Sequence, residues 1–136
     1  MGTESLQARI SLNNQKIREL ESQISELKRL LNRLLAKQNE FDNYVSNFSD
    51  LMRREVANVQ KIRMFENTRV AEGLADSLHI SFTGSQANNA FESFKRIENS
   101  LQQKIEETEH DLKKAKREIN QLESDISYCR REIAII

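Results

Sequence analysis

The residues best suited to chemistry are two histidines, His79 and His110, and a single cysteine, Cys129. His110 follows a glutamate-rich stretch over residues 106–109, and a histidine beside carboxylates can bind a metal ion or transfer protons. With 31% charged residues in the chain, such neighbours arise by chance in a helix. The sequence therefore predicts no metal site, no cofactor and no catalytic constellation, and we expect a protein that is not an enzyme.

The other reactive or charged features also favour plain structural roles. One cysteine excludes an internal disulfide and a cysteine-cluster metal site, and its spacing predicts a small buried hydrophobe. The basic cluster at residues 113–117 is balanced by acidic residues just upstream, and the chain carries 21 basic and 21 acidic side chains. Because phosphate binding usually requires a basic excess, we expect no nucleic-acid partner.

Composition points to helices as the elements that position these residues. The 136 residues include no proline and only three glycines, which leaves little turn chemistry for a sheet or a loop-built site. No stretch approaches the ~20 apolar residues that cross a bilayer, so we expect no membrane insertion. The N-terminus lacks the apolar stretch of a secretory signal, and cytoplasmic synthesis is the expectation. The predicted fold class is all-α.

Two heptad repeats define the predicted helices. From residue 6 to 62, apolar residues alternate spacings of four and three, which is typical of a coiled-coil seam. A second repeat runs from residue 87 to the end and includes Ile105, Leu112 and Cys129. Residues predicted to form the interface seam are Ile17, Leu20, Ile24, Leu27, Leu31, Phe65, Leu74, Phe91 and Phe94.

The register fails between the repeats. Continuing the first frame past Ile62 would place Gly73 and three charged residues in the seam. The apolar residues there wrap further round the helix, which indicates either a local unwinding or a second buried face. They are Met64, Phe65, Val70, Leu74 and Leu78.

Residues 79–85 contain the main cluster of helix breakers, and we place the turn there. Thr83 followed by Gln86 fits a capping box, and Phe82 could staple onto Ala87. Helix one is then expected at about 4–78, the turn at about 79–84 and helix two at about 85–134, as one elongated module, residues 1–136.

A turn at that position makes the two antiparallel arms unequal. Residues 4–30 would overhang by roughly 40 Å at ~1.5 Å per residue, although this segment has the cleanest seam. Either helix one breaks near residues 39–43 and folds back, or the overhang binds another chain. We favour a continuous helix, because the seam passes through that window unbroken, and therefore a partner chain.

The turn sequence also carries a family resemblance. Residues 82–91 read Phe-Thr-Gly-Ser-Gln-Ala-Asn-Asn-Ala-Phe. This stretch resembles the aromatic-x-Gly turn of the Trp-x-Gly superfamily of bacterial type VII secretion, and more closely the small helical proteins that accompany LXG-type toxins. Ala87 and Phe91 match the alanine and the large aromatic that follow in that family. Phe82 and Gly84 form the turn motif, with Phe82 in place of the family's Trp.

The resemblance implies further expectations. Tyr128 and Glu132 match the family's aromatic-x-x-x-acid secretion signal, although an i, i+4 pair on a helix surface explains the same spacing. The implied function is a targeting chaperone that packs against the N-terminal helical domain of an LXG toxin, with or without a second small helical protein. The implied location is the cytoplasm, followed by export with the toxin by a route that uses no signal peptide. The alternative is a homo-oligomeric structural coiled coil, such as a tether or scaffold, and a homodimer is compatible with both.

Overall fold

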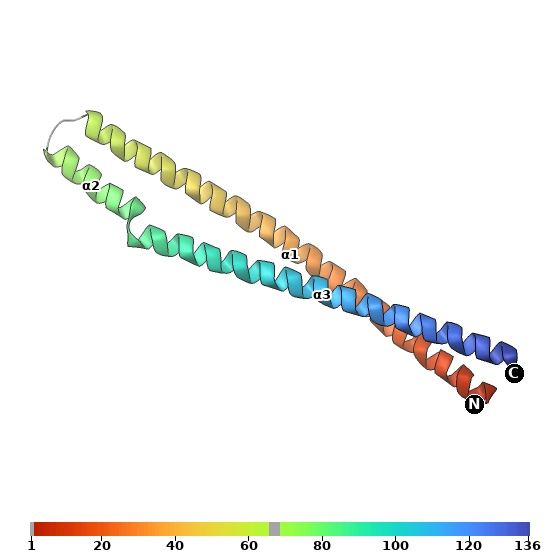
Figure 1. The fold of residues 1–136 in the computed structure, drawn as a ribbon. Helices are drawn as coiled ribbons and strands as arrows, with labels where there is room; N and C mark the ends of the chain where they lie inside the picture. Colours follow the sequence, from red (N-terminus) through yellow and green to blue (C-terminus); the bar gives the residue numbers. More distant parts are fainter. Residues whose placement is uncertain (1, 66–68) are drawn as a thin grey trace. The chain divides into compact units, whose positions relative to one another are not determined.

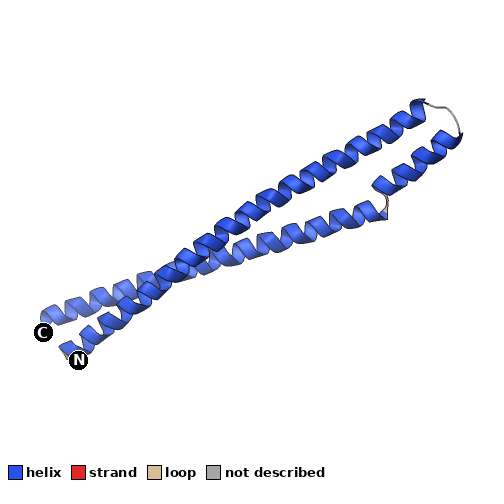
Figure 2. Cartoon of the chain, turned by 180° about the vertical axis from the view of Figure 1, so that it is seen from behind, coloured by secondary structure: helices blue, strands red, loops and turns tan. Residues whose placement is uncertain are grey.

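The computed structural model describes residues 2–65 and 69–136, and their side chains except those of 62–65, 69–71, 81–82 and 85–86. The described chain consists of three helices and contains no strand (Figures 1 and 2). This confirms the all-α class and a helical hairpin in which α1 packs against α3. The helices are α1 (Thr3–Phe65), α2 (Arg69–Thr83) and α3 (Ser85–Ile135).

The helix boundaries differ from those expected at the turn. The chain changes direction between the end of α1 and the start of α2, and α2 runs back along α1 (Figure 1). The predicted turn at 79–84 is wrong, because residues 79–83 are the last residues of α2. The prediction that helix one is unbroken at 39–43 is confirmed, since α1 passes through that window.

Thr83 does not begin a helix as the capping-box prediction required. It is the last residue of α2, and its hydroxyl donates a hydrogen bond of 2.6 Å to the carbonyl of His79 one turn earlier. Such back-bonding is typical of serine and threonine inside helices. Gly84 alone separates α2 from α3. The predicted contacts of Phe82 and Gln86 lie outside the described side chains.

The chain divides into two compact units. Unit 1 comprises Met1–Leu35 and Lys104–Ile136, which are the start of α1 and the end of α3. Arg9 and Asn13 of α1 both hydrogen-bond Asp125 of α3, and the two chain ends lie side by side (Figure 1). The predicted overhang of residues 4–30 is therefore wrong. The chain reverses before α2 and not after it, so the end of α3 lies beside this segment.

The core of unit 1 follows the predicted seams. Side chains from both heptad repeats are buried between α1 and α3, as hydrophobic periodicity requires. Thr108 is a polar member of this core, and its hydroxyl bonds the carbonyl of Lys104 at 2.8 Å within the same helix. The buried apolar residues are Leu6, Ile17, Ile105, Leu112, Ala115, Ile126 and Cys129.

Unit 2 comprises Ala36–Gln103 and contains the rest of α1, all of α2 and the start of α3. Its buried residues include Val59, Ala75 and Ala87. Aromatic rings of α1 and α3 form a cluster with edge-to-face centroid distances of 5.2 to 6.0 Å, a favoured geometry for ring pairs. This aromatic cluster consists of Phe41, Tyr44, Phe48, Phe91 and Phe94.

Cys129 offers a direct test of the packing in unit 1. Its side chain is 0% exposed, so a thiol reagent can reach it only when unit 1 opens. We expect labelling by a maleimide to be slow in the native protein and fast in denaturant, measured by mass spectrometry over time. Labelling of the native protein at the rate of the denatured chain would contradict this assignment of the seam.

Candidate interaction surfaces

The candidate chemical residues do not assemble into a reactive centre. Among the described residues, no group of three or more His, Cys, Asp or Glu side chains is placed to hold a metal ion. His110 is exposed on α3, His79 is half-buried on α2, and Cys129 is buried in unit 1. The Nδ1 atom of His79 is buried without a hydrogen-bond partner. None of the described helices is long and apolar enough to cross a membrane.

A polar cluster joins the two helices of unit 1 near the chain ends. The Arg9 guanidinium donates two hydrogen bonds to the Asp125 carboxylate, one of them from Nε at 2.8 Å. The Asn13 amide donates a third, at 2.6 Å, and Asn13 is only 5% exposed. Hydrogen bonds from Arg9 and then Asn13 hold the pKa of the Asp125 carboxyl below its usual value. A buried asparagine in a coiled-coil seam specifies register, and here it recognises one carboxylate.

This cluster predicts an acid-sensitive unit 1. Because the pKa of Asp125 is lower in the folded than in the unfolded chain, its contribution to stability is present above the unfolded value and is lost as pH falls through the folded one. We expect unit 1 to lose stability progressively below about pH 4, near the unfolded carboxyl's pKa. Urea melts across pH 2 to 7 should show a smaller acid dependence for Asp125→Asn. Glu109→Gln, at an exposed site on the same helix outside both grooves, is the control, and equal profiles for both variants would contradict the prediction.

The predicted secretion-signal residues lie beside the polar cluster. Tyr128 is 47% exposed, and the guanidinium carbon of Arg9 lies 5.9 Å from its ring centroid, within cation–π range. Glu132, one turn later, is half-buried. The Tyr128 ring is therefore accessible on one side and covered by α1 on the other.

A groove runs along one side of unit 1. Two hollows of 540 and 450 Å³ share Leu20, Gln23 and Glu118 and so form one continuous surface, which we call the unit 1 groove. Apolar residues and charged residues of both signs line it. The apolar members are Leu20, Leu27, Leu30, Ala115 and Leu122; the charged members are Arg9, Lys16, Glu19, Glu26, Arg33, Asp111, Lys114, Glu118 and Asp125.

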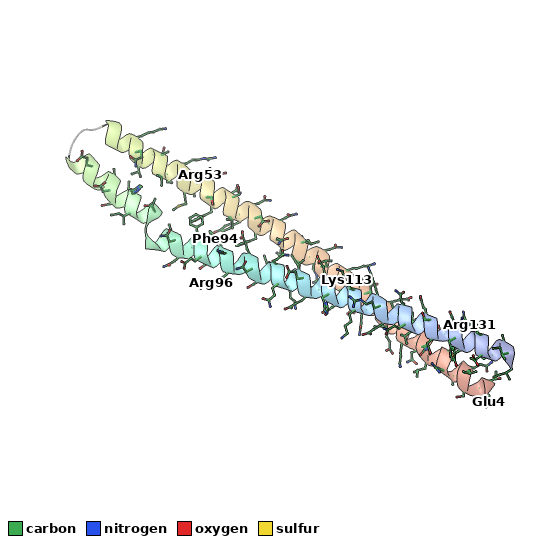
Figure 3. The ribbon with its side chains drawn as sticks, viewed as in Figure 1. Glu4, Arg53, Phe94, Arg96, Lys113 and Arg131 are labelled. Atoms are coloured by element: carbon green, nitrogen blue, oxygen red, sulfur yellow. The ribbon has the colours of Figure 1, made fainter. Side chains whose placement is uncertain are left out.

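A second, more apolar groove lies in unit 2. It has a volume of 310 Å³ and is lined by side chains of α1, α2 and α3, and we call it the unit 2 groove. Phe91 connects it to the aromatic cluster, because its ring lies 5.6 Å from Phe48 and 6.0 Å from Phe94. Figure 3 shows Phe94 between α1 and α3, whereas Arg96 lies on the outer side of α3. The lining residues are Ser49, Met52, Arg53, Val56, Thr83 and Phe91.

The structure places the predicted seam residues at different depths. Ile17 is buried, and Leu20, Ile24, Leu27, Leu31 and Phe94 are half-buried. Leu74 and Phe91 are exposed, and the side chain of Phe65 lies outside those described. Of the turn motif, Gly84 lies at the junction of α2 and α3. The sequence analysis predicted neither the Arg9–Asp125 pair nor the two grooves. For the pair, the one available signal is Asn13, a polar residue at a position of the first heptad seam.

Comparison with known proteins adds no identification. No family model, no curated protein and no solved structure matches the chain.

Proposed function

We propose that the chain is a helix-binding partner of another protein, and that this partner is the N-terminal helical domain of an LXG-type toxin. The chain would act as a targeting chaperone through helix–helix packing and not as an enzyme. The observation that carries the proposal is the unit 2 groove, an apolar hollow between helices whose lining includes Met52, Val56 and Phe91.

Several large apolar side chains of unit 2 are exposed to solvent, which supports a binding role. Tyr44 is 56% exposed, although its ring belongs to the aromatic cluster. Leu51, on the same helix, is 52% exposed. Two packed helices bury only one stripe of each, so apolar residues beside the stripe remain in water until a further helix covers them. Among the side chains of unit 2 that the structure describes, the exposed large apolar ones are Tyr44, Leu51, Leu74, Ile80, Phe91 and Ile97.

The groove favours an amphipathic helix as the bound element. Helix-in-groove recognition uses apolar anchors at i, i+3 or i+4 and i+7, and aromatic side chains often form the centre of such contacts. Arg53 lies on the rim, where its 80% exposed side chain forms an ion pair of 3.3 Å with Asp50. It would exchange this surface pair for an acidic residue beside the anchors of the bound helix. The resemblance of residues 82–91 to proteins that accompany LXG toxins selects the partner.

Export is part of the same proposal. Tyr128 and Glu132 lie on α3 one turn apart, with Tyr128 accessible, and would form part of the signal read by the type VII machinery. The chain would then assemble with the toxin, and a second small helical protein where one is present, in the cytoplasm before export. The alternative, a homo-oligomeric tether or scaffold, would fill the unit 2 groove with this chain's own helices.

The experiment is co-purification of the chain with the N-terminal domain of an LXG toxin encoded beside it in the genome of its source organism. Ser49→Arg places a long charged side chain at the groove lining without removing any core residue, so we expect it to abolish co-purification. Ser46→Arg, the same change at an exposed site outside both grooves, should leave binding intact. Absence of binding by the unmodified chain, or equal binding by the two variants, would contradict the proposal.

A further inference from the structure

We propose that the unit 1 groove binds a second copy of this chain in antiparallel orientation, with a two-fold axis at the level of Glu21 of α1 and Lys116 of α3. This interface is separate from the unit 2 groove and does not depend on a toxin partner. The argument rests on the order of charges along the groove. The chain has zero formal net charge, so no overall repulsion opposes association.

The two axis positions lie at the same level in unit 1. Arg9 and Asn13 both reach Asp125, so Asp125 lies level with about residue 11 of α1. Ten residues further along α1, Glu21 is then level with about residue 115 of the antiparallel α3. A two-fold axis perpendicular to the helices can therefore pass both Glu21 and Lys116.

On α1, this axis places opposite charges against each other. In an antiparallel pair of α1 helices centred on Glu21, Lys16 lies opposite Glu26 of the second copy, and the symmetry repeats the pair. Both side chains line the groove. Leu12, which is 51% exposed, lies opposite Leu30 of the second copy, so an isolated apolar side chain gains an apolar neighbour.

On α3, the same axis gives the same result. In an antiparallel pair of α3 helices centred on Lys116, Lys114 lies opposite Glu118 of the second copy, and the symmetry repeats this pair. Asp111 lies opposite Gln121, an amide that can donate to a carboxylate. All four line the groove. Two independent helices thus present self-complementary charges about one common level.

Two like-charged oppositions remain at the ends of the groove, each repeated by the symmetry. Arg9 lies opposite Arg33 of the second copy, and Asp125 lies opposite Glu107 of the second copy. Both hydrogen bonds of the Arg9 guanidinium go to Asp125, so an acid already accompanies this charge. The arginine opposition lies twelve residues from the axis, or about 18 Å along a helix, and the acidic one lies nine residues away, or about 14 Å. Arg33 and Glu107 are exposed, so solvent screening reduces each repulsion.

The charges disfavour the other face-to-face arrangement. If two copies packed in the same direction, α1 of one would lie over α3 of the other at the same level. Glu19 would then oppose Glu118, and Glu26 would oppose Asp111. Like charges in direct opposition disfavour an interface, so the groove selects the antiparallel dimer.

Charge exchange in the full chain tests this interface. Lys16→Glu and Glu26→Lys each replace two attractive pairs by two repulsive ones, and each should weaken dimerisation about tenfold or more. The double variant restores opposite charges and should recover the dimer. Lys28→Glu, an exposed reversal on α1 outside the groove, controls for net charge and should dimerise like the parent.

Sedimentation velocity over a hundredfold range of concentration measures the association, and circular dichroism verifies that each variant is folded. A concentration-dependent dimer, weakened by each single reversal and recovered in the double variant, supports the proposal. A parent chain that remains monomeric at every concentration would overturn it. A double variant that dimerises no better than the single variants would also overturn it, because the dimer would then use another surface.

Discussion

Leu112→Asp should eliminate cooperative folding of unit 1. Leu112 is buried between α1 and α3, and a carboxylate there would lose its hydration without gaining a partner. Removing a buried leucine side chain costs about 2–5 kcal/mol, and an unpaired charge adds to that cost. Because small domains are stable by only about 5–15 kcal/mol, we expect a large loss of helical signal at 222 nm and a much lower melting temperature.

Leu51→Asp is the matched control for this substitution. Leu51 lies on α1 and is 52% exposed, so the aspartate remains in water and the change should be within about 0.5 kcal/mol, as for most surface sites. Thermal melts of both variants provide the comparison. A Leu112→Asp protein that melts like Leu51→Asp would show that the seam of unit 1 is misassigned.

Gly84→Ala should destabilise the junction of α2 and α3. A Cβ atom built on Gly84 lies 2.4 Å from the carbonyl oxygen of Ile80, and the same oxygen accepts a hydrogen bond of 2.7 Å from the Gly84 amide. Because the obstacle is backbone and not the end of a flexible side chain, α2 or α3 must move to admit a methyl group. Overpacking of this kind costs about 1–3 kcal/mol.

Gly73→Ala should have the opposite effect on stability and raise the free energy of unfolding. Gly73 lies within α2, and no atom approaches its Cβ position within 4 Å. Alanine is favoured over glycine inside a helix by about 0.5–1 kcal/mol, so this variant should be more stable than the parent. Urea melts of the two variants are the measurement. A stabilised Gly84→Ala protein would contradict the close approach at the junction.

The heptad pattern was sufficient to predict the all-α class and most of the core of unit 1, but not the end of α1 or the separate helix α2. Apolar residues such as Ile17, Ile105 and Leu112 occupy seam positions in the sequence and are buried in unit 1. The pattern succeeded because a long helix buries the same stripe whatever its partner is. It also indicated that α1 continues through residues 39–43, where propensity alone would favour a break.

The position of the reversal could not be deduced from turn chemistry. Thr83 and Gly84 are typical turn residues, yet they form a junction between two helices. Residues 66–68, between α1 and α2, include neither glycine nor proline. The better signal was the loss of the heptad register after Ile62, three residues before α1 ends.

The interaction surfaces depend on the register between helices and were therefore hidden from the sequence. Asn13 is recognisable as a polar residue at a seam position, but its partner Asp125 could be identified only once the position of the chain reversal was known. The unit 1 groove could likewise be identified only from the structure, because charged side chains of both α1 and α3 line it. Because the turn was predicted at residues 79–84, every pairing between the two arms that follows from that turn is shifted along the helices.

The Arg9–Asp125 pair has a consequence for the order of folding. Its two residues are 116 positions apart in the chain, whereas the Gln38–Gln102 hydrogen bond of unit 2 joins residues 64 apart. Closing a longer loop costs more chain entropy, so the contacts of unit 2 should form first and bring the arms of unit 1 together. Folding would then proceed as a zipper from unit 2 toward the chain ends. Substitutions at Asp125 should accordingly speed unfolding while leaving the folding rate nearly unchanged.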